Sequence, residues 1–314
     1  MRRREFVKGA ATALGVAAAR APWAATRGPV RSLGLQLFTV MSPLEQDFEG
    51  TLRQVAAIGY REVETIGAFG RDPHLVRKLL DRYGLKSPSQ HLVPGDLYRV
   101  FSDYVHHRIE GPKIQKLWQE TATVDRIGAT VEEGIARAKI LGQRYIVLQI
   151  VWPEQVATRQ LVDEFCKGLN LGGELCAKAG LVFCFHNHSV ELEPVNGYVP
   201  YDLFLAQTDP ATVKLEMDVY WMVHGKADPL DYLARHPGRY RQFHLKDSTP
   251  AGDFTTVGQG ILDFPKLIEA GRKAGVEHFY VEYDRSTDPM KESREAFVMR
   301  ASKSFTRGFI RALN

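Results

Sequence analysis

The sequence has no long hydrophobic run and few cysteines, and these absences narrow the class of protein. None of its apolar runs approaches the roughly 18 residues that a membrane-spanning helix needs. Its three cysteines, Cys166, Cys176 and Cys184, are an odd number and show no disulfide framework. Ten residues of predicted helix would separate Cys166 from Cys176 by about 15 Å, too far for a disulfide. Cys184 falls in an apolar strand pattern, and we expect it to be a small core residue.

The sequence also lacks an excess of charge once its N-terminal segment is set aside. Residues 1–25 hold five basic residues and one acidic residue, whereas the whole chain of 314 residues holds 41 and 37. The remainder therefore has 36 of each and is formally neutral. A protein that follows nucleic-acid phosphates needs a basic excess, so the composition does not support nucleic-acid binding.

The N-terminal segment has the layout of an export signal. Basic residues precede a short stretch rich in alanine, glycine, valine and leucine, and small residues follow. The segment "RREFVK", with Arg3, Arg4, Phe6 and Lys8, is similar to the twin-arginine consensus. We therefore predict a signal at residues 1–25, the twin-arginine export machinery as a partner, a periplasmic location and no stable membrane anchor. A disordered basic tail is the alternative.

Beyond this segment, short β-rich runs alternate with amphipathic helical patterns that often end in glycine. The predicted strands are Leu33–Phe38, Glu62–Ile66, Leu85–Gln90, Tyr145–Ile150, Leu181–His186, Val213–Asp218, Tyr240–Leu245 and His278–Tyr283. Strict alternation of strand and helix implies a parallel sheet, and eight such units predict a closed (β/α)8 TIM barrel. We predict one domain over residues 26–314. It has an insertion at about 92–129 that either contributes to function or forms an extra surface helix pair.

Polar side chains gather at the ends of these predicted strands. A TIM barrel places its active site there, because inward-facing residues of all eight strands converge on one mouth. A single histidine or aspartate at a strand end is more often a cap or a turn residue, so only the whole set is informative. The polar residues at or near strand ends are Gln36, Glu62, Glu64, His91, Gln149, His186, Asp218, His244, Lys246, Asp247, Glu282 and Asp284.

Three of these residues predict a metal site. Asp218, His244 and Glu282 each follow an apolar inward-pointing pattern, and one group from the fifth strand would complete a four-ligand site. Mixed carboxylate and imidazole ligands suit one divalent ion, namely Mn, Zn, Fe, Co or Mg. The alternative is a metal-free network of ion pairs. We favour the metal because neighbouring carboxylates need compensating positive charge.

Four segments resemble the sugar phosphate isomerase/epimerase family. They are "GLQLFTV", "FHNHSVELEP", "LEMDVYWMVHGKADPLDYLARHPGRYRQFHLKD" and "GQGILDFPKLIEAGRKAGVEHFYVEYD". That family shares a xylose isomerase-like barrel with endonuclease IV, ketose 3-epimerases and inosose dehydratases. The resemblance extends over about residues 31–311, and it is specific for the family rather than for a substrate.

The resemblance implies a metal held by glutamate, aspartate, histidine and glutamate at the ends of strands five to eight. Asp218, His244 and Glu282 match the last three ligands. His186 stands where the family has its first glutamate, and inosose dehydratase-like members also have histidines there. We therefore assign His186 as the fourth ligand, with Glu191 as its competitor.

The same region supplies candidates for catalysis. His188 shares a strand face with His186 and is a candidate acid or base. Glu191 matches the region where epimerase relatives place a substrate-contacting carboxylate. Lys246 is a candidate to stabilise an enolate oxygen or to bind a hydroxyl; a salt bridge with a nearby acid is the alternative. We assign catalysis to His188, Glu191 and Lys246, and substrate binding to Gln36, Glu64, His91 and Trp221.

Such a site fits proton abstraction next to the carbonyl of a small carbohydrate, through an enediolate. Reprotonation would make the protein a sugar isomerase or epimerase, which we predict. Loss of a β-substituent from a keto-sugar or 3-keto-glycoside would instead make it a dehydratase or lyase. The predicted export favours unphosphorylated or oxidised sugars. A non-catalytic periplasmic sugar-binding barrel is a third interpretation.

An endonuclease IV-like phosphodiesterase is disfavoured. Trp221 stands three residues past Asp218, where those relatives have a further histidine, and no second Asp-x-His pair follows His244.

Overall fold

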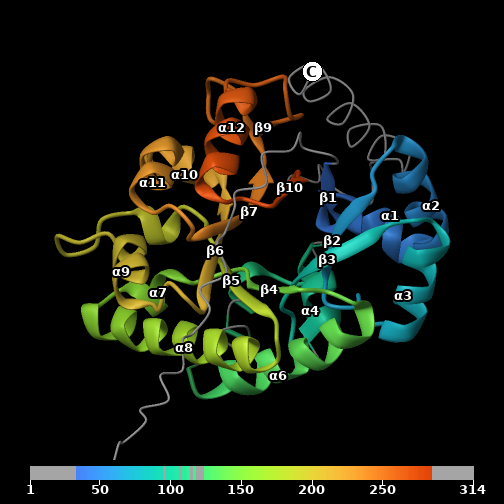
Figure 1. Cartoon of the computed structure of the whole chain (residues 1–314), viewed down its shortest axis with the longest axis horizontal. Coiled ribbons are helices and arrows are strands. Elements are labelled where there is room, and N and C mark those ends of the chain that lie inside the picture. The colour runs from blue at the N-terminus through green and yellow to red at the C-terminus, as the bar shows by residue number, and fades with distance from the viewer. Residues whose placement is uncertain (1–32, 95–96, 106–107, 114–115, 118–123, 285–314) are drawn as a thin grey trace, which may run out of the picture.

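The computed structural model describes residues 33–94, 97–105, 108–113, 116–117 and 124–284. Eight parallel strands close into a barrel that helices surround (Figure 1). The barrel strands are β1 (Gly34–Gln36), β2 (Glu62–Ile66), β3 (Lys86–His91), β4 (Tyr145–Leu148), β5 (Val182–His186), β6 (Val213–Asp218), β7 (Tyr240–Leu245) and β10 (His278–Val281). β1 pairs with both β2 and β10, which closes the barrel. The predicted TIM barrel is therefore confirmed.

The helices fill the connections between these strands. The α-helices are α1 (Met41–Gln46), α2 (Phe48–Ile58), α3 (Pro73–Arg82), α4 (Leu97–Val105), α6 (Val124–Leu141), α7 (Pro153–Val156), α8 (Arg159–Lys178), α9 (Pro200–Gln207), α10 (Val219–His224), α11 (Pro229–Arg235) and α12 (Phe264–Ala274). The described part of the chain also holds the short 3-10 helices η1 (Leu37–Val40) and η2 (Val190–Leu192). The predicted signal at residues 1–25 and parts of the predicted insertion lie outside the described residues.

Sequence patterns located all eight barrel strands, but the bounds of five of them differ from the prediction by one or two residues at an end. β2, β6 and β7 have the predicted bounds, but β1 ends at Gln36 instead of Phe38. The Gln36 side chain accepts a hydrogen bond from the Phe38 backbone N–H at 3.1 Å, and this turns the chain into η1. A side chain that bonds to its own backbone two residues on competes with strand pairing.

Local chemistry also explains where helices begin and end. Asp72 precedes α3, and its side chain accepts from the His74 N–H at 2.9 Å, while Pro73 occupies the first helical position. α12 ends at Ala274, and the residue that follows, Gly275, has a φ of 102°, which glycine adopts at little cost. These signals are readable in the sequence.

The close approach of α8 to the barrel depends on a glycine in this helix. A Cβ atom built on Gly172 would lie 2.8 Å from the ring of Phe183, which is buried in β5. Glycine therefore lets α8 lie directly on the strand that ends in His186.

A small hairpin after β7 was not predicted. Its strands β8 (Asp247–Ser248) and β9 (Phe254–Thr255) pair antiparallel. The Asp247 carboxylate accepts hydrogen bonds from the backbone N–H groups of Gly258 at 2.9 Å and Gly260 at 2.8 Å. Asp247 thus fixes the loop that follows β7 at the carboxyl end of the barrel.

The cysteines and the helices agree with the sequence analysis. Cys166, Cys176 and Cys184 are free thiols and all three are buried. Within the described part of the chain, no helix combines the length and the apolar character needed to cross a membrane.

Candidate metal centre

The candidate site lies at the carboxyl ends of the barrel strands. Strand register brings its polar residues together, because His186 of β5 lies opposite Glu216 of β6, and Asp218 lies opposite His244 of β7. Glu216 and Asp218 are two residues apart, so they share one face of β6. All four side chains are buried.

Asp218 is held in place from two sides. Its backbone N–H donates to the Asn187 side chain at 3.0 Å, which ties the end of β6 to the loop after β5. Its Oδ1 accepts from the Trp221 N–H at 3.0 Å and caps α10. Oδ2 is therefore the oxygen left to face the site.

Three of the four predicted metal ligands converge in one group. Asp218, His244 and Glu282 each offer an atom that lies within 4.8 Å of the other two. His244 Nδ1 is in hydrogen-bonding contact with Glu282 Oε2. The Lys246 ammonium lies 2.9 Å from both Asp218 Oδ2 and Glu282 Oε2, and 2.6 Å from Asp284 Oδ2. The predicted alternative for Lys246, a salt bridge with nearby acids, is therefore present.

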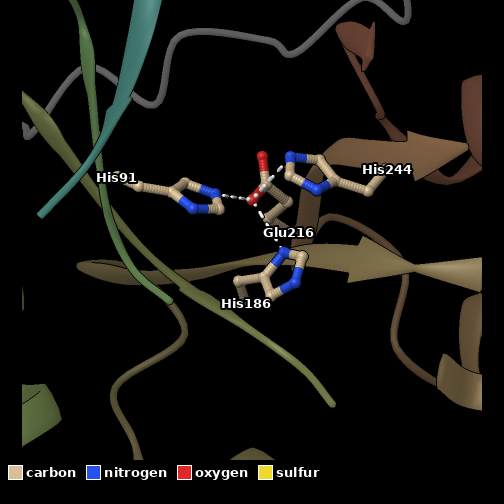
Figure 2. A group of neighbouring side chains, drawn as sticks. All are labelled: His91, His186, Glu216 and His244. Atoms are coloured by element: carbon tan, nitrogen blue, oxygen red, sulfur yellow. Dashed lines mark hydrogen bonds and ion pairs between the residues drawn. The ribbon is translucent and has the colours of Figure 1, made fainter. Parts of the chain in front are cut away.

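The fourth predicted ligand, His186, belongs to a second group with His91, Glu216 and His244 (Figure 2). Three imidazoles point at one carboxylate oxygen, Glu216 Oε2. His91 Nε2 and His186 Nδ1 each lie 2.9 Å from it, and His244 Nε2 lies 3.2 Å from it. His186 Nε2 lies 3.8 Å from Asp218 Oδ2. His186 is thus placed between the two groups.

Glu64 adjoins the second group and links it to the first strand. Its Oε2 lies 2.6 Å from His244 Nε2 and 3.2 Å from His91 Nε2. Gln36 Nε2 donates to the same oxygen at 2.6 Å, and the Ser89 hydroxyl donates to Oε1. These contacts fix the rings of His91 and His244 through buried hydrogen bonds.

The buried charges shift the pKa values of the imidazoles in opposite directions. Burial alone would lower the pKa of His91, but the carboxylates of Glu64 and Glu216 raise it to about 9. Burial and the positive charge of His244 lower the pKa of His186 to about 3. His186 is therefore neutral at pH 7, which is the form that binds a metal.

The predicted catalytic residues His188 and Glu191 lie beside each other in the loop after β5. His188 is partly exposed, its ring centroid lies 5.0 Å from that of His186, and burial and the nearby positive charges lower its pKa well below the ordinary value. Glu191 is fully buried; its Oε1 accepts from the His188 N–H at 2.8 Å, and burial raises its pKa to about 8. Among the described residues, His188 Nδ1 and Glu191 Oε2 have no hydrogen-bond partner.

The predicted substrate-binding residues separate into two places. Gln36, Glu64 and His91 are buried within the hydrogen-bond network already described. Trp221 is partly exposed, lies 5.3 Å from the ring of His188 between centroids, and has the Lys246 ammonium 5.8 Å from its ring. Their roles in binding stay predictions.

Glu216 was missed by the sequence analysis. It stands two residues before Asp218 in "LEMD", so the alternation of side chains along a strand places both on one face. Because Asp218 is the last polar residue of β6, the polar residues at the strand ends include Asp218 and not Glu216.

The donors of both groups fit a divalent cation. They are imidazole nitrogens and carboxylate oxygens, which suit Mn, Zn, Fe or Co. Within the described part of the chain, Glu216 Oε1 is buried without a hydrogen-bond partner, which costs free energy unless a ligand satisfies it. The buried His/Glu cluster is therefore consistent with a divalent metal site.

Comparison with known families agrees with this geometry. A family model described as "Xylose isomerase-like TIM barrel" matches residues 52–301. The chain belongs to this family.

Individual relatives of this xylose isomerase-like barrel are distant. The inosose dehydratase of Geobacillus thermodenitrificans is 23% identical over 276 residues, which cover 82% of this chain and 88% of the relative. A solved sugar phosphate isomerase/epimerase from Parabacteroides distasonis is 26% identical, with a TM-score of 0.70, and the match covers 88% of this chain and 97% of that one. The IOLI protein, solved with a bound zinc atom, is 14% identical with a TM-score of 0.61; the match covers 87% of this chain and 96% of that one and shows a shared fold.

Proposed function

We propose that this protein is a divalent-metal-dependent sugar isomerase or epimerase that removes a proton next to a carbonyl group. The observation that carries the proposal is the convergence of Asp218, His244 and Glu282 with the buried Lys246 ammonium at the carboxyl end of the barrel. Such a site combines cation ligands with a fixed positive charge where an enediolate would develop negative charge.

The metal would be held by Asp218, His244 and Glu282, with His186 as the fourth ligand through Nε2. A bound divalent cation acts as a Lewis acid toward carbonyl and hydroxyl oxygens. Glu64 would accept the N–H of His244 Nε2 and so keep Nδ1 free for the metal, since 2.6 Å separates Nε2 from Glu64 Oε2.

The environments of His188 and Glu191 support acid and base roles for them. Burial and neighbouring positive charges keep the pKa of His188 low, so its imidazole is neutral at pH 7 and able to accept a proton. Burial raises the pKa of Glu191 to about 8, so its carboxyl group holds a proton at pH 7. Environments that separate two pKa values in this way are typical of acid–base pairs. We propose His188 as the base, and Glu191, which bonds to its backbone, as its positioning residue or as the acid.

Lys246 would act as a fixed charge rather than as a base. Burial opposes its charge, but Asp218, Asp284 and Glu282 raise its pKa well above the ordinary value, so it stays protonated. An ammonium that cannot lose its proton stabilises a neighbouring oxyanion without reorganisation.

Dehydration is a second candidate, favoured by the similarity to inosose dehydratases. The proton-abstraction step would be the same, and a protonated Glu191 would assist the departure of a hydroxyl or glycosyl group. The substrate would then be a keto-sugar, a keto-polyol or a 3-keto-glycoside.

Deuterium exchange tests the proposal and separates its two forms. The full chain, stripped with EDTA and reloaded with Mn²⁺, would be incubated in D₂O with ketoses, a keto-inositol and a 3-keto-glucoside. We expect metal-dependent deuterium at the carbon next to the carbonyl, with an epimer or isomer for the first form and loss of water or of the aglycone for the second. His188→Ala should abolish exchange. His278→Gln, at the amino end of β10, should not. A metal-loaded protein that exchanges no proton in any substrate would contradict the proposal and indicate a sugar-binding barrel.

We also propose periplasmic export through residues 1–25, on the layout of that segment. In a bacterial host with the twin-arginine pathway, cell fractionation should find the wild-type chain in the periplasm. Replacing Arg3 and Arg4 with lysine should retain it in the cytoplasm. Equal export of both would refute the proposal.

A further inference from the structure

The interior of the barrel next to the metal centre is polar. TIM barrels mostly fill this space with layers of bulky apolar side chains. Here Ser89 of β3 and Gln242 of β7 are fully buried. Their side chains contact each other although β3 and β7 are not neighbours in the sheet, so both lie inside the barrel. Buried polar groups cost free energy unless they are hydrogen-bonded, so the bonds of these two residues decide what they can do.

These residues belong to one chain of hydrogen bonds that leads to Glu64. The Tyr280 hydroxyl donates to Gln242 Oε1 at 3.5 Å, and Gln242 Nε2 donates to Ser89 Oγ at 3.1 Å. The Ser89 hydroxyl donates in turn to Glu64 Oε1. A hydroxyl group has a single proton to donate. Because Gln242 supplies the bond that Ser89 accepts, the proton of Ser89 is directed to Glu64.

The other oxygen of Glu64 faces the metal ligand His244. Glu64 Oε2 lies 2.6 Å from His244 Nε2 and accepts from Gln36 Nε2, also at 2.6 Å. With Ser89 bonded to Oε1 and Gln36 bonded to Oε2, the carboxylate is fixed at both oxygens. A carboxylate fixed in this way can accept the N–H of His244 Nε2, and Nδ1 is then left on the side of Glu282, where the proposed function has its metal.

Strand register builds this chain directly into the barrel. Ser89 lies opposite Glu64 where β2 and β3 pair. Gln242 stands two residues before His244 in β7, so the two side chains share one face of that strand. The strands that carry Glu64 and His244 therefore also place the two residues that connect them from inside the barrel.

We propose that Ser89 and Gln242 are positioning residues of the metal centre. They act on the metal only through Glu64, which holds the ring of His244 with Nδ1 directed to the cation. Loss of either residue should weaken cation binding although every metal ligand stays in place. Changes to outer partners of this kind typically lower metal affinity by about 10–100-fold. The inference rests on the proposed function for the presence of a metal at His244.

The affinity of the full chain for Zn²⁺ tests the proposal. Ser89→Ala removes the hydroxyl, and Gln242→Met removes the amide but keeps a side chain of similar length. Each protein would be stripped with EDTA, and Zn²⁺ binding would be measured at pH 7 by competition with a chromophoric chelator. We expect each variant to bind Zn²⁺ about 10–100-fold more weakly than the wild type. The double variant should bind no more weakly than the weaker single variant, because both changes break the same chain.

The matched control is Gln143→Met. Gln143 is also buried and also donates to Ser89, but to its backbone oxygen, at 3.1 Å, and not to its hydroxyl. This variant should lose stability and keep its Zn²⁺ affinity. Urea unfolding in EDTA, followed by circular dichroism, would show that each variant is folded. It would also allow Zn²⁺ affinities to be compared between variants of similar stability.

The outcomes separate this inference from the proposed function. Unchanged Zn²⁺ affinity in Ser89→Ala and Gln242→Met, or an equal loss in Gln143→Met, would overturn the positioning role even if the wild type exchanges a sugar proton. Additive losses in the double variant would also overturn it, because two residues of one chain cannot act independently. Weaker Zn²⁺ binding limited to the chain would support it even if no sugar exchanges a proton. A wild type that binds no Zn²⁺ would overturn both proposals.

Discussion

Replacing Lys246 with methionine should destabilise the protein strongly unless a divalent cation is present. The Lys246 ammonium contacts Asp218, Glu282 and Asp284 at 2.6 to 2.9 Å, and its side chain is only 2% exposed. Water therefore cannot replace the lost charge, and the variant would leave three carboxylates together without their common partner.

The size of the effect follows from the burial of these groups. Removing one partner of a buried ion pair costs about 3–5 kcal/mol, because an uncompensated charge stays behind. Methionine retains most of the aliphatic volume, so a cavity adds little. We expect Lys246→Met to lower the free energy of unfolding by about 3–5 kcal/mol in EDTA. A cation bound by Asp218 and Glu282 would supply the missing charge, so Mn²⁺ should recover a large part of this loss.

Urea unfolding at pH 7, followed by circular dichroism with EDTA or Mn²⁺, measures both effects. Lys273→Met is the matched control, because Lys273 Nζ also pairs with a glutamate, Glu269, at 2.7 Å, but both side chains are mostly exposed. That exposed pair should contribute little. If Lys246→Met lost no more stability than this control, or if Mn²⁺ recovered nothing, the assignment of Lys246 as the charge partner of the site would be wrong.

Three further predictions concern packing, pH dependence and loop order. Gly172→Ala should lower the free energy of unfolding in urea by about 1–3 kcal/mol, since the new Cβ would lie 2.8 Å from the Phe183 ring; unchanged stability would contradict this packing. Burial raises the pKa of Glu191 to about 8, so the folded protein holds this proton more tightly than the unfolded chain does. The free energy of unfolding should therefore fall as the pH rises from the ordinary pKa of glutamate to about 8, and Glu191→Gln should not show this fall. Parallel curves of stability against pH for the two proteins would refute the prediction. Asp247→Ala should speed amide hydrogen exchange in residues 256–262, measured by mass spectrometry, because three backbone N–H groups lose their acceptor; equal exchange would show that the loop is fixed otherwise.

Most strands of the barrel were predictable because they are buried on both faces. Such strands read as short apolar runs, and "VFCFH" of β5 is an example, whereas β3, "KSPSQH", has no such run. Strand ends were less predictable where a side chain competes for the backbone. Gln36 ends β1 through its own hydrogen bond to Phe38, and no periodicity in the sequence reports that bond.

The sequence predicted most residues of the candidate site, but it did not predict which of them lie next to one another. Asp218, His244 and Glu282 stand at strand ends, and a closed barrel must bring such residues together. Glu216 was missed, although it lies on the same face of β6 as Asp218. The position of His186 between two sets of acids was not foreseen, because it depends on the relative orientation of rings on three strands.

The sequence by itself determined the barrel, the end of the barrel that holds the polar residues, and the nitrogen and oxygen chemistry of the site. These features follow from the alternation of apolar and polar residues, which is local information. Only the tertiary structure decided which nitrogen of His186 and of His244 faces which carboxylate. That choice depends on strand register and on Glu64, which reaches His244 across the barrel from a distant part of the chain.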